Sequence, residues 1–191
     1  MSLKVRIRAD STPCARVLPP EGSRGSIGQA MERLWTPWRM AYIKGEARHP
    51  GCVFCDMPAA DPTKDRENLV LARGDKAFVI MNKYPYNAGH VLVATYRHEA
   101  RYEELEPEEH AEMAEWTSRC IRALEREYKP QGYNVGFNMG TAAGAGIEDH
   151  LHLHVVPRWN GDTNYMTTVS DVKVLPETLE QTFDRLKHSL G

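Results

Sequence analysis

Five short segments of the chain are apolar and rich in β-branched or aromatic residues, a composition typical of β-strands. They are residues 68–74, 77–83, 89–96, 132–138 and 150–159. Pro, Asn and Gly within residues 84–89 mark a turn between the second and third segments. The first three segments therefore predict an antiparallel meander, and the last two predict strands that join the same sheet.

Two further segments carry apolar residues at steps of three and four, the period of an amphipathic helix. The first segment runs from Pro107 to Tyr128, and the second lies at the C-terminal end. Their apolar positions are Met113, Trp116, Cys120, Ile121 and Leu124, and then Leu175, Leu179, Phe183, Leu186 and Leu190. The order β-β-β-α-β-β-α predicts an α+β fold, an antiparallel sheet of about five strands with helices packed on one face. Residues 46–66 show no such period and are predicted to form a loop.

Composition and charge indicate the number of domains and the expected partners. The chain has 191 residues, of which 41% are hydrophobic, and this suits one globular domain with a real core. Residues 1–28 are rich in Pro, Gly, Ser and Arg and are predicted to be a flexible arm, which leaves residues 29–191 as a single domain. The net charge of −2 gives no indication of nucleic-acid or membrane binding. Because residues 1–20 lack the apolar core of a secretory signal, we expect a cytoplasmic protein.

The last predicted strand has an unusual pattern, because His150, His152 and His154 alternate with apolar residues. Alternate side chains of a strand share a face, so the three imidazoles point one way, and Leu151, Leu153 and Val155 point the other way into the core. The row could be a solvated face without a role, or one metal site that uses all three rings. It could also divide the labour, with one ring attacking, one donating hydrogen bonds and one serving structure or a metal. The outer two Cα atoms of such a row lie about 13 Å apart, which suits one zinc ion poorly.

The loop before this strand favours divided labour. Residues 138–146 ("NMGTAAGAG") contain three glycines and little side-chain bulk. Such loops allow backbone N–H groups to approach an anion closely, as phosphate-binding nests do. A phosphate held there would lie beside an imidazole, which is an arrangement for attack on phosphorus.

Two of the four cysteines, Cys52 and Cys55, form the sequence "CVFC". In a reducing compartment this C-x₂-C spacing is more typical of a metal site or a redox pair than of a structural disulfide. A reduced pair without a ligand is the simplest alternative. A thioredoxin-like role is disfavoured because no suitable βαβ pattern follows.

The histidine row also carries a family resemblance. Residues 150–156 match the signature His-φ-His-φ-His-φ-φ, with φ apolar, and so resemble the histidine-triad (HIT) family. The likeness extends over about residues 31–165. "MNKYPYNAGHVLVATYRH" resembles the nucleoside-pocket strands of the family, and "VVPRW" is similar to the branch that cleaves dinucleoside polyphosphates. "RLWTPWRMAYIKGE" followed by "CVFC" resembles bacterial diadenosine tetraphosphate phosphorylases or hydrolases.

The resemblance implies roles for individual residues. His152 would attack the α-phosphorus and form a nucleotidyl-histidine intermediate, which water or inorganic phosphate would then release. His154 would donate a hydrogen bond to phosphate oxygens and assist the leaving group. Asn82 would contact the nucleoside and Trp159 would close the site. Phosphate would be bound by Asn138 and by the backbone of Gly144, Ala145 and Gly146.

The resemblance also implies a metal site and a partner. In zinc-bearing relatives the ligands correspond to Cys52, Cys55, His98 and His150, which would form a closed structural Cys₂His₂ site. His90 is expected to be structural. Relatives pair as twofold dimers, so we expect a homodimer, and Trp35 and Trp38 are candidates for the core or the interface. In one departure from the family, "AGAGIEDH" lacks the Ser or Thr that many members carry shortly before the triad.

Together these features predict a nucleotidyl transferase or hydrolase that cleaves dinucleoside polyphosphates, with diadenosine tetraphosphate as the first candidate. The alternatives are a nucleoside phosphoramidase of the same superfamily, a nucleotide-binding sensor without turnover, and a metal-binding module that uses the triad itself. The sequence does not decide between water and phosphate as the acceptor in the second step.

Overall fold

The computed structural model describes residues 49–162 and 177–190, and every described residue belongs to one compact unit of the chain. The predicted arm of residues 1–28 lies outside them, as do Trp35, Trp38 and the first apolar position of the last helix, Leu175. Within the described residues no helix is both long and apolar enough to cross a bilayer.

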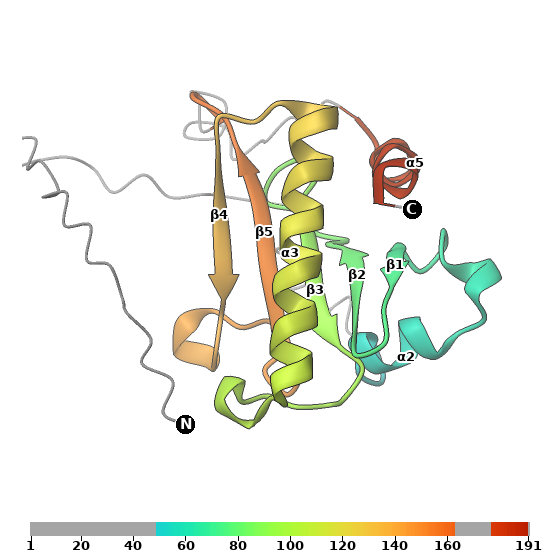
Figure 1. Ribbon diagram of the computed structural model, residues 1–191, viewed down its shortest axis with the longest axis vertical. Helices are drawn as coiled ribbons and strands as arrows, with labels where there is room; N and C mark the ends of the chain where they lie inside the picture. Colours follow the sequence, from blue (N-terminus) through green and yellow to red (C-terminus); the bar gives the residue numbers. More distant parts are fainter. Residues whose placement is uncertain (1–48, 163–176, 191) are drawn as a thin grey trace, which may run out of the picture. The chain divides into compact units, whose positions relative to one another are not determined.

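The described chain forms five strands, three α-helices and three short 3₁₀ segments (Figure 1). The strands are β1 (Val70–Arg73), β2 (Ala77–Met81), β3 (Val91–Thr95), β4 (Gly132–Phe137) and β5 (His152–Arg158). The helices are α2 (Val53–Ala59), α3 (Pro107–Tyr128) and α5 (Leu179–Leu190). The 3₁₀ segments are η1 (Pro62–Lys64), η2 (Tyr102–Glu104) and η3 (Thr141–Ala143). The predicted α+β class with a five-stranded antiparallel sheet is confirmed.

The sheet has the order β1-β2-β3-β5-β4, and all neighbouring strands are antiparallel. The strand with the histidine row, β5, lies between β3 and β4. Its register places His152 opposite Ala94 and His154 opposite Leu92. His154 is therefore paired on both sides, since it also lies opposite Gly136 of β4, and His152 is paired with β3, away from the open edges of the sheet.

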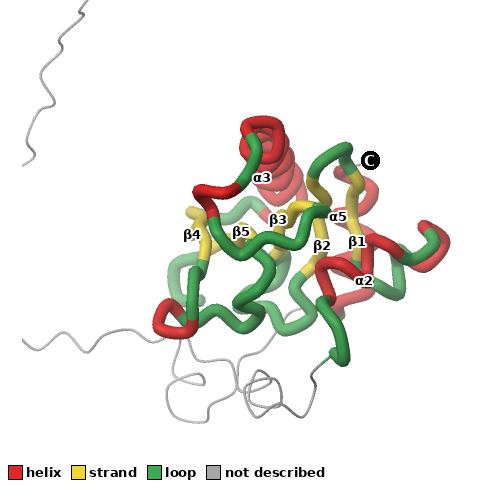
Figure 2. The backbone as a smooth tube through the Cα atoms, turned by 90° about the horizontal axis from the view of Figure 1, so that it is seen from below, coloured by secondary structure: helices red, strands yellow, loops and turns green. Residues whose placement is uncertain are grey.

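The helices α3 and α5 cover one face of the sheet, as the apolar periods predict. Buried side chains of α3, such as Trp116 and Leu124, pack with Phe183 and Leu186 of α5 against inward residues of the strands. The helix α3 begins with a capping box in which Glu106 and Glu109 bond each other's backbone N–H groups, and it ends at Lys129 in the left-handed conformation. Seen along the strands, α3 lies on one side of the sheet (Figure 2).

The other face carries α2, which the sequence did not predict. The carbonyl of Cys52 accepts hydrogen bonds from the backbone N–H groups of Cys55 and Asp56, and these bonds begin the helix inside the predicted loop. Phe54 is 2% exposed and packs with a smaller apolar cluster of this face. The cluster consists of Phe54, Val70, Phe78, Ile80, Leu92 and Ala94. Because α2 has only seven residues and contains Pro58, it shows no amphipathic period.

The predicted strand of residues 150–159 is shorter in the structure. The strand β5 begins at His152, two residues later than predicted. The backbone N–H of Leu151 donates instead to the carbonyl of Glu99, 2.7 Å away, in the segment that follows β3. His150 thus lies just before the start of β5 and can face a different partner from His152 and His154.

Candidate active site and metal centre

The central histidine of the row, His152, is buried against the apolar cluster of the α2 face. Its Nδ1 donates a hydrogen bond of 2.8 Å to the carbonyl oxygen of His150. Burial lowers the pKa of His152, and so favours the neutral ring. In a neutral imidazole with the proton on Nδ1, Nε2 keeps an unprotonated lone pair. His152 therefore has the tautomer of a nitrogen nucleophile, with Nε2 as the reactive atom.

The third histidine, His154, belongs to a chain of hydrogen bonds that begins at the backbone of Tyr86. The N–H of Tyr86 donates to His90 Nδ1, at 3.1 Å. His90 Nε2 lies 3.0 Å from His154 Nδ1. Because His90 Nδ1 is an acceptor, the neutral His90 ring carries its proton on Nε2 and donates it to His154. When both rings are neutral, His154 then carries its proton on Nε2 and can donate there, whereas Nε2 of His152 can accept.

His90, for which the sequence predicted a structural role, contacts the third histidine of the row. It is 1% exposed, and its ring stacks on Tyr86 with the centroids 4.8 Å apart. The rings of His152 and His154 are themselves 5.0 Å apart. The partner of His90, His154, lies 64 residues away in the sequence, so local spacing could not bring the two rings together.

Asn82, the predicted nucleoside contact, lies beside the His90–His154 pair. Its Nδ2 is 3.3 Å from His90 Nδ1, and its Oδ1 accepts the backbone N–H of Tyr84 at 2.9 Å. Asn82 therefore stabilises the turn between β2 and β3 at the place where that turn meets the histidine row. Its contact with a nucleoside stays a prediction.

The predicted phosphate loop connects β4 to the histidine row. Asn138 follows β4 directly, and Gly140 and Gly144 have φ values of 77° and 81°, a region that favours glycine. The N–H groups of Gly144 and Ala145 donate to the carbonyls of Thr141 and Gly140 within the loop. Phosphate binding by these two amides would therefore require the loop to open. The predicted roles of Asn138 and Gly146 stay predictions.

Trp159 comes just after β5 and is half-buried. Its backbone N–H donates to a carboxylate oxygen of Asp162 at 3.2 Å. The same carboxylate accepts hydrogen bonds from Arg158 and from the buried Asn87. The Arg158 guanidinium holds the pKa of Asp162 well below its usual range. This network connects the end of β5 to the turn that carries Asn82, and it fixes the backbone of Trp159; closure of the site by its ring stays a prediction.

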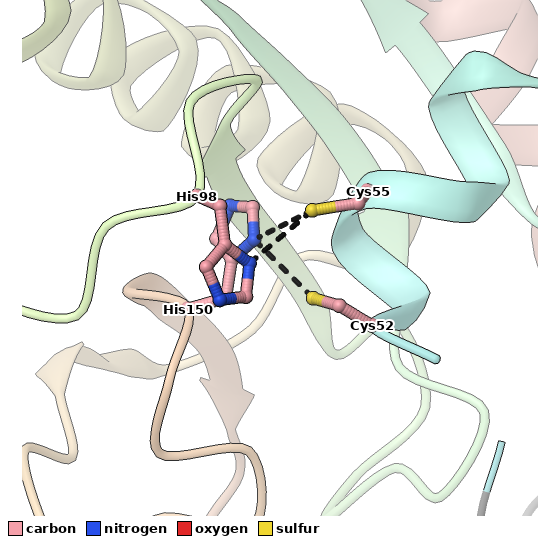
Figure 3. A group of neighbouring side chains, drawn as sticks. All are labelled: Cys52, Cys55, His98 and His150. Atoms are coloured by element: carbon pink, nitrogen blue, oxygen red, sulfur yellow. Dashed lines mark hydrogen bonds between the residues drawn. The ribbon is translucent and has the colours of Figure 1, made fainter. Parts of the chain in front are cut away.

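The four predicted metal ligands come together at the start of the row (Figure 3). One ligand atom from each of Cys52, Cys55, His98 and His150 lies within 4.8 Å of all the others. His150 Nδ1 is 3.3 Å from Cys52 Sγ and 3.5 Å from Cys55 Sγ, and His98 Nδ1 is 3.3 Å from Cys55 Sγ. In a tetrahedral zinc site, sulfur and nitrogen ligands lie about 3.6 Å apart. The donor set and its spacing therefore fit a zinc ion.

The surroundings orient these ligands. His150 is fully buried, and its Nε2 donates to the carbonyl of Thr95 at 2.8 Å, which leaves Nδ1 unprotonated and facing the two sulfurs. Burial lowers the pKa of His150 to about 4, which keeps the ring in the neutral form that binds metals. Burial and the neighbouring Cys52 raise the pKa of the Cys55 thiol to about 11. The Cys₂His₂ donor set, with its four ligand atoms close together, fits a metal role better than a redox role.

Comparison with known proteins supports the family that the histidine row indicates. The family model of the HIT domain matches residues 63–161. The AP-4-A phosphorylase of Mycobacterium tuberculosis is 40% identical over 166 residues, which is 82% of this chain and 84% of that protein. The bis(5'-adenosyl)-triphosphatase of Dictyostelium discoideum is 28% identical over 93 residues, covering 49% of this chain and 62% of that protein.

One similar solved structure contains zinc, the metal that fits the four-residue cluster. The crystal structure of a zinc-bound histidine triad family protein from Mycobacterium smegmatis has a TM-score of 0.57 and 29% identity. The match covers 73% of this chain and 93% of that one. The fold, the histidine row and these matches place the chain in the histidine-triad (HIT) family. Its homologues include nucleotide-processing enzymes.

Proposed function

We propose that the chain cleaves dinucleoside polyphosphates, with diadenosine tetraphosphate as the first candidate, through a nucleotidyl intermediate on His152. The observation that carries the proposal is the hydrogen bond from His152 Nδ1 to the carbonyl of His150. It leaves Nε2 of a buried, neutral imidazole as a nucleophile beside a second ring, His154, that acts as a donor. The names of the phosphorylase and the triphosphatase among the relatives support the same substrate class.

The reaction has two displacements at the same phosphorus. In the first, His152 Nε2 attacks the α-phosphorus, a phosphorus–nitrogen bond forms, and the bond to the bridging oxygen of the leaving polyphosphate breaks. His154 donates from Nε2 to the developing charge on the phosphate oxygens and the leaving group. In the second, water or inorganic phosphate attacks the same phosphorus and the bond to His152 breaks, which restores the ring. Two steps of lower barrier thus replace one difficult displacement.

The substrate contacts follow the sequence predictions. Asn82 binds the nucleoside, and Trp159 covers the site. Asn138 and the backbone of residues 144–146 bind phosphate oxygens once the loop opens and frees the amides of Gly144 and Ala145. The position of Asn82 beside the His90–His154 pair supports its part of this assignment. Because the loop carries no hydroxyl at residues 143–149, the leaving oxygen is stabilised by His154 and backbone amides.

Cys52, Cys55, His98 and His150 hold a structural zinc ion in this proposal. With four protein ligands the site is closed, so the metal supplies rigidity and no substrate position. Zinc content measured after purification tests the assignment. Wild-type protein is expected to hold about one zinc per chain, and a Cys52→Ala, Cys55→Ala variant to lose it. Unchanged zinc in that variant would show that the metal lies elsewhere, for example on the triad.

The proposal includes a homodimer. The strand β4 is the last strand of the sheet, its outer edge has no neighbouring strand among the described residues, and Val135 on it is 45% exposed. An exposed strand edge with an apolar side chain can pair with a second copy. Light scattering coupled to gel filtration tests this; a dimer mass is expected, and a monomer at micromolar concentration would contradict it.

Product analysis with diadenosine tetraphosphate tests the function and also decides the acceptor. ADP and ATP that appear only with added phosphate would establish phosphorolysis, whereas AMP and ATP without phosphate would establish hydrolysis. Adenosine phosphoramidate is assayed in parallel, because faster turnover of that compound would make the protein a phosphoramidase. If neither compound is turned over, the site only binds nucleotides.

A further inference from the structure

Phe54 lies between the two cysteines of the metal cluster and contacts the proposed nucleophile. Its ring is 2% exposed, and its centroid is 4.6 Å from that of His152, at an interplanar angle of 33°. The same ring is 5.4 Å from the ring of His150. The C-x₂-C turn therefore places an aromatic face directly against the ring that is proposed to attack phosphorus.

His150 makes a second contact from the cluster to His152. Its ring faces Cys52 and Cys55, while its carbonyl oxygen accepts the proton of His152 Nδ1 at 2.8 Å. His152 is thus held at its ring face by Phe54 and at one ring nitrogen by the backbone of His150. Both contacts originate in the segments that the four ligand residues bring together.

The imidazole needs such contacts to present the correct nitrogen. Rotation of a histidine ring about the Cβ–Cγ bond is broad and roughly two-fold, so a half turn exchanges the positions of Nδ1 and Cδ2 and puts the carbon Cε1 where Nε2 was. The carbonyl bond selects one of these two orientations, and a packed aromatic ring limits the swing of the side chain. A displacement of about 1 Å at a reacting group can cost about 10²-fold in rate.

We propose that the Cys52–Cys55 turn is a positioning device for the nucleophile, with Phe54 and the His150 carbonyl fixing the orientation of His152. The inference rests on the proposed role of His152. Neither group touches the reacting atoms, so Phe54 and His150 are positioning residues. A metal ion held by the cluster would fix both contacts at once, and its removal would loosen the His152 ring.

The alternative is that Phe54 only fills the core of the α2 face. Phe78 offers a matched control, because it is a buried phenylalanine of the same apolar cluster, and its ring packs against Tyr96. If Phe54 were only a filler, Phe54→Leu and Phe78→Leu would lower stability and leave the rate of the folded enzyme alike. If Phe54 positions His152, only Phe54→Leu lowers kcat.

The experiment compares three full-length proteins: wild type, Phe54→Leu and Phe78→Leu. Their kcat and KM are measured with diadenosine tetraphosphate. We expect Phe54→Leu to lower kcat by about 10- to 100-fold with KM nearly unchanged, and Phe78→Leu to change kcat less than about threefold. Equal kcat values in the two variants would overturn the proposal. If Phe54→Leu fails to fold, Phe54→Met replaces it, because the flexible methionine side chain adapts to irregular gaps in a core.

Nuclear magnetic resonance of ¹⁵N-histidine protein supplies a readout that needs no substrate. Wild type is expected to show His152 as one tautomer with the proton on Nδ1, whereas Phe54→Leu and chelator-treated wild type show a mixture. A single unchanged tautomer in both samples would overturn the proposal. Because this measurement is independent of turnover, failure of the proposed function and failure of the positioning role give different results.

Discussion

The two faces of the sheet bury different kinds of side chain. The face under α3 and α5 is apolar, and its large cluster includes fully buried Leu124 and Val93. The opposite face buries polar rings, among them His90, His150 and His152, around a smaller apolar cluster. The same strand β5 serves both, because successive side chains of a strand point to opposite faces.

This difference assigns stability and chemistry to separate faces. Apolar burial stabilises the fold through the helix-covered face, where packing is dense and tolerates little change. On the histidine face, the side chains are held in place mainly by hydrogen bonds from their ring nitrogens to specific partners. Substitutions on the two faces should therefore change different properties of the protein: activity on the histidine face and stability on the helix-covered face.

The largest expected effect is on activity. His152→Ala should lower kcat/KM on diadenosine tetraphosphate by at least about 10³-fold, since it removes the nucleophile. The far-ultraviolet circular dichroism should stay that of the wild type, because the large apolar cluster is untouched. His188→Ala, at an exposed histidine of α5, is the control and should retain full activity. Substantial turnover by the His152 variant would contradict the role of this ring.

The next effect is on stability. Leu124→Ala should lower the free energy of unfolding by about 2–5 kcal/mol, because it creates a cavity in the middle of the helix-covered face. Urea denaturation measures the change, and kcat of the folded variant should stay within about twofold of wild type. A large loss of kcat with normal stability would show that the two faces are not separate.

A smaller and pH-dependent effect is expected at the end of β5. Asp162→Asn should lower the free energy of unfolding by about 1–3 kcal/mol at pH 7, since charged hydrogen bonds from Arg158 and Asn87 are weakened. The folded-state pKa of Asp162 lies below its ordinary value of 3.8. Its contribution is therefore present above about pH 4 and is lost as the pH falls through the folded-state pKa. Urea titrations at pH 7, 5 and 3 should show the difference shrinking only at the lowest pH, whereas a constant difference would contradict the role of the charge.

The smallest effect is expected on the solvent side of α3. Arg122 forms an ion pair with Glu115, and the two side chains are 65% and 64% exposed. Arg122→Ala should change the free energy of unfolding by less than about 0.5 kcal/mol. A larger loss in urea denaturation would indicate that this surface is covered in solution, as it would be at a subunit interface.

The sequence predicted the sheet and the long helices because their signals are local. The period of three and four in α3 and the β-prone runs of the five strands depend only on neighbouring residues. The helix α2 was missed because it has only seven residues and buries only two of them, Phe54 and Pro58, which is too few to give a helical period. The sequence placed the start of β5 two residues too early for a different reason. The backbone N–H of Leu151 donates to the carbonyl of Glu99, which is distant in the sequence.

For the site, the resemblance supplied what local patterns could not. The cluster of Cys52, Cys55, His98 and His150 was predicted by likeness to zinc-bearing relatives, and the structure brings these residues together. Neither the contact of His90 with His154 nor that of Phe54 with His152 could be inferred from spacing, because both depend on the packing of segments that are distant in the sequence.

Direct detection of the covalent intermediate tests the central claim. Wild-type protein is mixed with diadenosine tetraphosphate, quenched within milliseconds at alkaline pH, where phosphorus–nitrogen bonds persist, and analysed by peptide mass spectrometry. The account predicts one adenylyl group on the peptide that contains His152, and none in a His152→Ala sample. An enzyme that turns over without an adduct, or that carries it on another residue, would contradict the account.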